Sequence, residues 1–99
     1  ILKRNMMAIH IKKLNREQFE VTVQKDEVTK HIVKITDAVH SKFTNNKLTK
    51  EQFLKKSFLF LLQREANTDI LREFNIELIQ EFFPEFAKIG KLGWIDVSV

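Results

Sequence analysis

The chain has 99 residues, which is the size of a single domain with one hydrophobic core. Its 43% hydrophobic and 30% charged residues, with two glycines and one proline, exclude a disordered, collagen-like or linker-like polypeptide. The absence of cysteine excludes disulfide bonds, thiolate catalysis and zinc sites with cysteine ligands. The longest apolar run, residues 58–62, is too short to cross a bilayer, so we expect a cytoplasmic protein with no membrane partner.

The net charge of +4 conceals an uneven distribution along the chain. Residues 1–56 contain thirteen Lys and Arg against six Asp and Glu, a balance of +7. Residues 57–99 contain four against seven, a balance of −3. A basic and an acidic half can attract each other within one chain or between two copies, as readily as either attracts an outside partner.

The first third of the chain has the pattern of a β-hairpin. Residues 19–24 alternate between apolar and polar side chains, which predicts a strand with one buried face. A polar turn at residues 25–27 precedes a segment rich in β-branched residues, 28–35, which predicts a second strand. Because an isolated hairpin is marginally stable, helices must cover it or another strand must extend it, and the alternation in residues 7–12 predicts a candidate third strand.

Helical signals begin at Thr36. This residue is suited to cap a short helix that ends at the turn-forming pair Asn45-Asn46. Thr49 and Gln52 then have the spacing of a capping box, which predicts the start of a long helix over residues 50–66. Its apolar side chains cover a wide arc, so this helix is expected to be central to a core or shared with a partner.

Two shorter helices are predicted next. Asn67 or Thr68 could cap the first, whose apolar residues would be Ile70, Leu71 and Phe74. Asn75 could cap the second, which Pro84 would end. Residues 88–93 are predicted to form a loop, and residues 94–99 a short strand, a docking arm or a vector-derived tail.

These elements predict one α+β domain over residues 1–99, with a two- or three-stranded antiparallel sheet followed by about four helices and the 50–66 helix at the centre. The core is expected over about residues 15–87. Residues 1–6 and 88–99 are expected to be frayed, to dock, or to derive from a vector, since Met6 and Met7 are plausible natural starts.

Three short motifs follow one another in the second half of the chain: the Arg-Glu pair Arg64-Glu65, an Ile-Leu-x-x-Phe step at residues 70–74 and a closing Phe-Pro-Glu-aromatic pattern at residues 83–86. Together with the hairpin and the capped helix, they resemble a group of short bacterial proteins that have no assigned activity. The resemblance covers about residues 15–87. The resemblance implies a compact bacterial cytosolic domain and transfers no catalytic residue. We interpret Arg64 with Glu65 as a structural clamp or ion pair.

No residue pattern predicts catalysis, a metal or a cofactor. The three histidines, His10, His31 and His40, have none of the short fixed spacings that metal sites use, and we interpret them as solvated or hydrogen-bonded side chains. Nucleophile motifs and glycine-rich phosphate loops are also absent. The sequence therefore predicts a protein that is not an enzyme and uses no cofactor.

Basic residues of the first half form the best case for a polyanion partner. Phosphate binding requires Lys and Arg clustered on one face, whereas base recognition also requires Arg, Asn or exposed aromatic rings. Lysine dominates here, so nucleic-acid binding is the alternative hypothesis and a solvated lysine face is the simpler one. The candidate polyanion-binding residues are Lys12, Lys13, Arg16, Lys42, Lys47, Lys50, Lys55 and Lys56.

Nine phenylalanines and no tyrosine point first to burial, since rings that meet water usually include tyrosine. Seven of the nine lie from Phe53 onward, opposite a thin β half. Either they fill the core of a monomer, or some form an apolar patch that a second copy covers. The candidate interface residues are Phe58, Phe60, Phe74, Phe82, Phe83 and Phe86. We therefore expect a non-enzymatic protein-interaction module that self-associates, most simply as a homodimer, through its Phe-rich helices.

Overall fold

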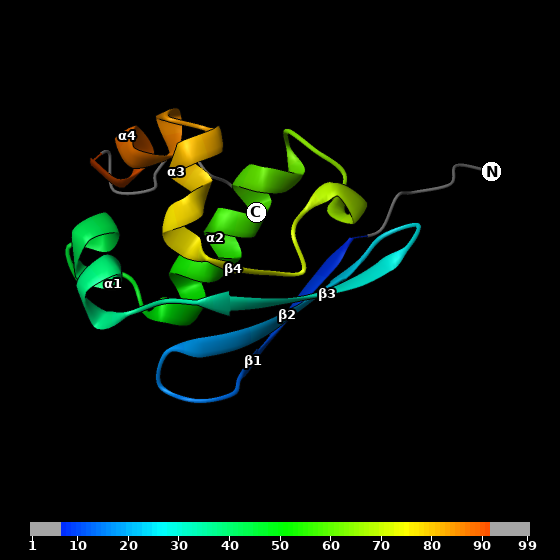
Figure 1. Cartoon of the computed structure of the whole chain (residues 1–99), viewed down its shortest axis with the longest axis horizontal. Helices are drawn as coiled ribbons and strands as arrows, with labels where there is room; N and C mark the ends of the chain where they lie inside the picture. The colour runs from blue at the N-terminus through cyan, green and yellow to red at the C-terminus, as the bar shows by residue number, and fades with distance from the viewer. Residues whose placement is uncertain (1–6, 92–99) are drawn as a thin grey trace.

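A computed structural model describes residues 7–91 and shows an α+β fold with one sheet and four α-helices (Figure 1). The sheet contains β1 (Ala8–Lys13), β2 (Gln18–Gln24), β3 (Val28–Lys34) and β4 (Glu73–Asn75), in the order β1-β2-β3-β4. The first three strands are antiparallel, and β4 lies parallel to β3. The predicted hairpin and third strand are confirmed, but the prediction of a purely antiparallel sheet of two or three strands is wrong.

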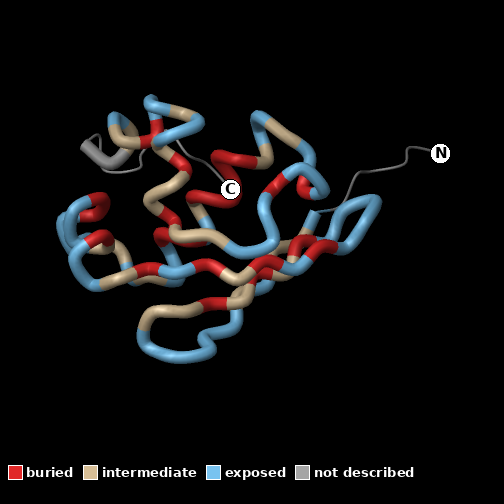
Figure 2. The backbone as a smooth tube through the Cα atoms, viewed as in Figure 1, coloured by how far each residue is buried: buried red, intermediate tan, exposed pale blue. Residues whose placement is uncertain are grey.

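The alternation in the sequence places one face of the sheet against the core. Phe19, Val21 and Val23 of β2 are buried, whereas the residues between them are only half-buried (Figure 2). The register pairs Val21 with His31 of β3, and Phe19 with Val33, so the buried positions of both strands face the same side. No helix of residues 7–91 lies on the opposite face, which carries polar side chains at most positions of β2 and β3.

Two capped helices follow the sheet. Helix α1 (Asp37–Thr44) begins after Thr36, whose hydroxyl accepts the N–H of Val39, and Asn45 ends it in the left-handed region at a φ of 54°. Helix α2 (Lys50–Leu62) has the predicted capping box: the Thr49 hydroxyl accepts the Gln52 N–H, and the Gln52 side chain accepts the Thr49 N–H. The helix ends four residues before the predicted Ala66.

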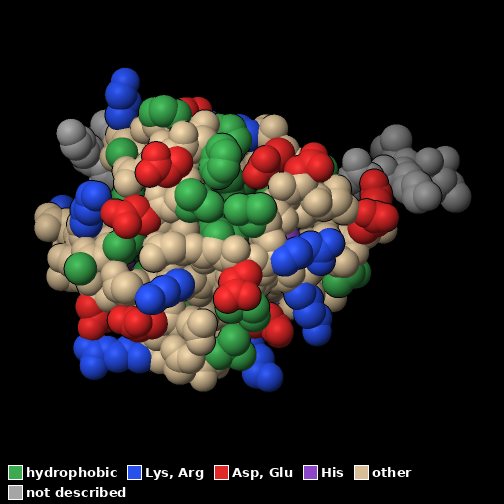
Figure 3. All heavy atoms as spheres, in the orientation of Figure 1, with side chains coloured by type: hydrophobic (Ala, Val, Ile, Leu, Met, Phe, Trp, Pro, Cys, Tyr) green, Lys and Arg blue, Asp and Glu red, His purple; other side chains and the backbone are tan. Residues whose placement is uncertain are grey.

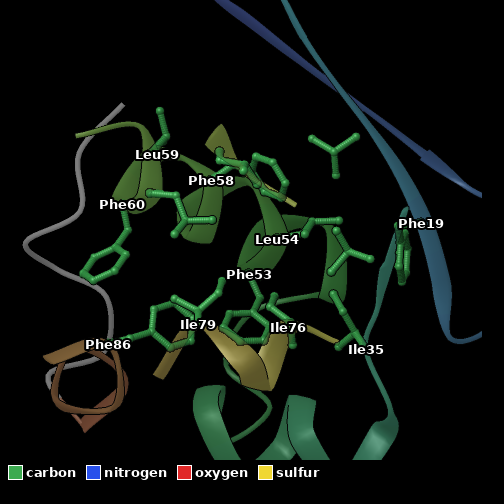
Figure 4. Close-up of a cluster of buried hydrophobic side chains, with 14 of the residues drawn as sticks. Phe19, Ile35, Phe53, Leu54, Phe58, Leu59, Phe60, Ile76, Ile79 and Phe86 are labelled. Carbon is green, nitrogen blue, oxygen red and sulfur yellow. The ribbon is translucent and has the colours of Figure 1, made fainter. Parts of the chain in front are cut away.

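Helix α2 is the central element of the core. Five consecutive residues, 57–61, are buried, so almost every side of its second half meets protein. Figure 4 shows its side chains lying between the sheet, which carries Phe19, and the C-terminal segments, which carry Ile79 and Phe86. The predicted central position of this helix is confirmed.

The segment after α2 does not form the predicted helix over residues 67–74. A single 3-10 turn, η1 (Asn67–Asp69), is followed by extended chain that becomes β4. Tertiary hydrogen bonds override the helical pattern: Asn67 Nδ2 donates to Glu27 O at 3.0 Å, and the Ile32 N–H donates to Arg72 O at 2.7 Å. These bonds hold the segment against β3.

The C-terminal part is more helical than the sequence predicts. A 3-10 turn, η2 (Ile76–Leu78), leads into α3 (Ile79–Phe82), which stops before Pro84 as expected. A fourth helix, α4 (Glu85–Lys91), then covers most of the predicted 88–93 loop. Proline is well tolerated at the start of a helix, and the buried Phe86 ring fixes α4 against α1 and α2. The predictions for residues 1–6 and 94–99 lie outside the described residues.

Candidate functional site: an apolar pocket with an acidic rim

The structure separates the six candidate interface phenylalanines into two groups. Phe58, Phe60 and Phe86 are buried in the core, so in the folded chain they offer no surface to a partner. Phe74 and Phe83 are half-buried. Phe82 is 66% exposed, and it is the one exposed ring among the nine phenylalanines, all of which lie within residues 7–91.

Phe74, Phe82 and Phe83 meet at one apolar pocket of about 310 Å³, which we call the Phe82 pocket. Its walls come from the end of α2, from the segment between η1 and β4, and from η2 and α3. Such a volume lies at the lower end of the range for ligand sites, and suits one or two side chains better than a large cofactor. The lining residues are Leu61, Glu65, Asp69, Ile70, Leu71, Phe74, Leu78, Ile79, Phe82 and Phe83.

Two exposed apolar side chains and two carboxylates border this pocket. Leu71 is 51% exposed and lies with Phe82 at its edge. Glu65 and Asp69 also line it, and neither takes part in an ion pair among the described residues. Burial raises the pKa of Glu65, and the negative charge of Asp69 raises it further. Figure 3 shows hydrophobic side chains gathered on the face that carries α3, with acidic side chains on both sides.

A buried hydrogen-bond chain holds one wall of the pocket. Asn67 Nδ2 donates to Thr29 Oγ1 at 3.0 Å, Thr29 Oγ1 lies 2.8 Å from His31 Nε2, and His31 Nδ1 lies 2.7 Å from Leu71 O. Because a carbonyl oxygen only accepts, Nδ1 must carry the proton and donate to Leu71, which leaves Nε2 to accept the Thr29 hydroxyl. The chain is therefore fully satisfied only with neutral His31. The last bond of this chain joins the Leu71 backbone to His31 of β3.

We expect the free energy of unfolding to fall when the pH drops below about 6.5, the ordinary histidine value. Burial lowers the pKa of His31, the hydrogen bond to Leu71 opposes this, and the positive charge of Arg72 adds to the lowering. Between these two pKa values of His31, the unfolded chain therefore binds more protons than the folded chain. The free energy of unfolding falls as the pH drops from the pKa of His31 in the unfolded chain to its lower pKa in the folded chain. For a single group, the free energy of unfolding can change by at most about 1.4 kcal/mol per pH unit.

Urea unfolding of the wild type and of His31→Gln at several pH values between 5 and 7.5, near the range in which histidine titrates, would test this expectation. The raised pKa of Glu65 acts in the opposite direction, but it is common to both proteins and cancels in the difference. If the free energy of unfolding changed equally with pH in the wild type and in His31→Gln, the assignment of a neutral, hydrogen-bonded His31 would be contradicted.

The predicted pair Arg64 and Glu65 is not an ion pair. Arg64 Nε instead donates to Glu85 Oε2 at 3.3 Å, and Arg64 Nη1 donates to Phe60 O at 3.0 Å. The guanidinium carbon lies 3.6 Å from the centre of the Phe60 ring, which is a cation–π contact. Arg64 is thus a structural clamp, as expected, but it joins the end of α2 to α4 and leaves Glu65 free to border the pocket.

The eight candidate polyanion-binding residues do not form one free basic surface. Arg16 pairs with Asp37, and Lys42 Nζ lies 3.2 Å from Glu77 Oε2. Lys50 Nζ lies 2.8 Å from Asp37 Oδ1, and its side chain is only 10% exposed. Lys12 and Lys13 lie on β1, Lys47 in the turn between α1 and α2, and Lys55 and Lys56 on α2. Among residues 7–91, ion pairs between elements therefore occupy at least three of the eight cations.

The histidines do not converge. His10 is exposed on β1, His31 is buried beside β4, and His40 Nε2 lies 2.5 Å from Leu48 O. Within residues 7–91, no group of three or more His, Asp or Glu residues could hold a metal ion. Over the same residues, no helix is long and apolar enough to cross a membrane.

Sequence reasoning missed most of the pocket. Its candidate interface residues include Phe74, Phe82 and Phe83, but not Leu71, Glu65 or Asp69. One signal was available: Ile70 and Leu71 are adjacent, and in extended chain neighbouring side chains point to opposite sides, so one of them is left outside the core. Helical periodicity hid this signal, because both residues fit a helix face.

No family model, no curated protein and no solved structure matches this chain.

Proposed function

We propose that this protein is a small non-enzymatic interaction module that docks a partner polypeptide, in the first instance a second copy of itself, in the Phe82 pocket. One observation carries the proposal: a chain that buries or half-buries eight of its nine phenylalanines leaves the ninth exposed at the mouth of an apolar pocket, beside an exposed leucine. Exposed apolar side chains that adjoin one another are typical of protein interfaces.

The size of the pocket indicates a weak and reversible interaction. Removing a half-exposed leucine or phenylalanine from water contributes on the order of 1 to 2 kcal/mol. A contact centred on Phe82 and Leu71 is much smaller than a standard stable interface. We therefore expect dissociation constants in the micromolar to millimolar range.

Polyanion binding has less support than pocket docking. Arg16, Lys42 and Lys50 each pair with a carboxylate, which offsets part of the positive charge of the candidate basic residues. Among the described residues no exposed aromatic ring lies on the basic half to stack on a base, because Phe19, Phe43 and Phe53 are buried.

The proposal predicts that sedimentation equilibrium will show reversible self-association that depends on the pocket. The variant Leu71→Asn/Phe82→Ser should remain an 11.8 kDa monomer at concentrations where the wild type associates. Val28→Ser is the matched control, because Val28 is 61% exposed but lies outside the pocket, and it should associate like the wild type. A wild type that stays monomeric at millimolar concentration, or pocket variants that associate unchanged, would contradict the proposal.

A further inference from the structure

We propose that the segment which occupies the Phe82 pocket is the loop between β1 and β2 of a second copy, with Leu14 as the inserted side chain. The copies would then associate head to tail, since one copy contributes its loop and the other its pocket. This inference rests on the proposed function and names the segment of the partner that the pocket accepts.

Charge argues against two pockets facing each other. A two-fold contact through the Phe82 pocket would bring Glu65 and Asp69 of one copy close to the same carboxylates of the other. Glu81, on α3 next to Phe82, would add to the repulsion. Like charges brought together in a partly desolvated contact oppose association, so the occupant should be an apolar side chain flanked by cations.

The same chain provides one such segment among its described residues. Outside the pocket, the exposed large hydrophobic residues are Met7, Leu14 and Val28. Val28 follows Asp26 and Glu27, which the acidic rim would repel. The cations next to Met7 are Lys3 and Arg4, and these lie outside the described residues. Leu14 is 44% exposed and has Lys12, Lys13 and Arg16 around it.

The loop that presents Leu14 is already ordered. Asn15 Oδ1 accepts the N–H groups of Glu17 and Gln18, each at 3.0 Å, and the Leu14 N–H donates to Gln18 O at 2.9 Å. Such a loop loses little conformational entropy when it docks. Lys12 and Lys13 take part in no ion pair among residues 7–91, so their charges are available to Glu65 and Asp69.

The loop and the pocket lie on opposite sides of the molecule. In Figure 1 the β1–β2 loop is at the bottom of the view, whereas α3 and the segment between α2 and β4 are above the sheet. A copy that docks its loop in a neighbour therefore keeps its own pocket open for a third copy. Such a head-to-tail contact continues beyond two copies, as a ring where the rotation between copies closes and as an open series where it does not.

Mixing two variants tests the inference directly. Leu14→Ser keeps the pocket but lacks the inserted side chain, and Leu71→Asn/Phe82→Ser keeps the loop but lacks the pocket. We expect each variant alone to be monomeric in sedimentation velocity, the wild type to grow beyond a dimer as concentration rises, and an equimolar mixture of the two variants to form a 1:1 dimer that does not grow. Circular dichroism should show that both variants are folded, since all three replaced side chains are exposed.

Charge variants provide a second arm. Lys12→Gln/Lys13→Gln should weaken self-association about tenfold, and its effect should shrink at high salt, because the cations act on Glu65 and Asp69. Lys47→Gln/Lys55→Gln has the same net charge and should leave association unchanged.

Two kinds of negative result distinguish the loop assignment from the proposed self-association. If the pocket variant is monomeric but Leu14→Ser associates like the wild type, or if the mixture stays monomeric, the loop assignment is wrong and the proposed function stands. If the wild type is monomeric at every concentration, the loop assignment and the proposed self-association are both wrong.

Discussion

Replacing Phe86 with alanine is expected to lower the free energy of unfolding by about 3 to 5 kcal/mol. The Phe86 ring is fully buried, and its centre lies 5.3 Å from the centre of Phe43, 5.3 Å from Phe60 and 6.1 Å from Phe53. The substitution removes a ring on which α1, α2 and α4 all pack. Because the surrounding rings relax only partly, a cavity remains and adds to the loss of burial.

Phe82→Ala is the matched control, since it makes the same chemical change at an exposed ring of α3, the helix that precedes α4. Its effect should be within about 1 kcal/mol. Urea unfolding followed by circular dichroism measures both variants. If Phe86→Ala is already unfolded in buffer, Phe86→Leu gives the comparison at a smaller loss. Equal effects of the Phe86 and Phe82 substitutions would contradict the division of these rings between core and pocket.

Thr29→Val is expected to lower the free energy of unfolding by about 2 to 4 kcal/mol. Valine has nearly the shape of threonine, so the change removes the hydroxyl with little change in packing. His31 Nε2 then has no donor, and one N–H of Asn67 has no acceptor, while both side chains remain buried. Each buried polar group left unpaired has a desolvation penalty of about 1 to 3 kcal/mol.

A threonine on the other face of the sheet provides the control. Thr22 is half-buried on β2, and its side chain makes no hydrogen bond within the part of the chain that the structure describes. Thr22→Val should therefore change the free energy of unfolding by less than about 0.5 kcal/mol. Hydrogen exchange of the Ile32 amide, which donates to Arg72 O, reports whether the segment beside the pocket loosens in Thr29→Val. Exchange at wild-type rates together with unchanged stability would show that the hydrogen-bond chain does not hold this wall.

Local patterns predicted the parts of the fold that local physics decides. The alternation in β2 and the capping box at Thr49 depend on residues close in sequence, and the structure confirms both. Strand β4 could not be predicted in this way. Its position depends on hydrogen bonds among Asn67, Thr29 and His31, which form only after folding. Asn67 follows Thr29 by 38 residues and His31 by 36 residues in the sequence.

Three of the candidate interface rings, Phe58, Phe60 and Phe86, are buried for a related reason. Phe58 and Phe60 are exposed only if nothing but the hairpin covers α2. The structure adds β4, whose Phe74 ring lies 6.2 Å from Phe58, and α4, whose Phe86 ring lies 5.3 Å from Phe60. The sequence patterns predicted neither β4 nor α4, so the burial of the Phe58 and Phe60 rings against them could not be predicted either. Phe82 remained outside because Pro84 ends its helix before the chain turns to form α4.

Amide chemical shifts of the wild-type chain, recorded by ¹H–¹⁵N NMR from millimolar to micromolar concentration, test the docking account most directly. We predict concentration-dependent shifts at two separate places, one around Glu65, Leu71 and Phe82 and the other around Lys13 and Leu14. Shifts that do not change with concentration, or that occur on the outer face of the sheet and leave the pocket unaffected, would contradict the claim that the Phe82 pocket is the docking surface.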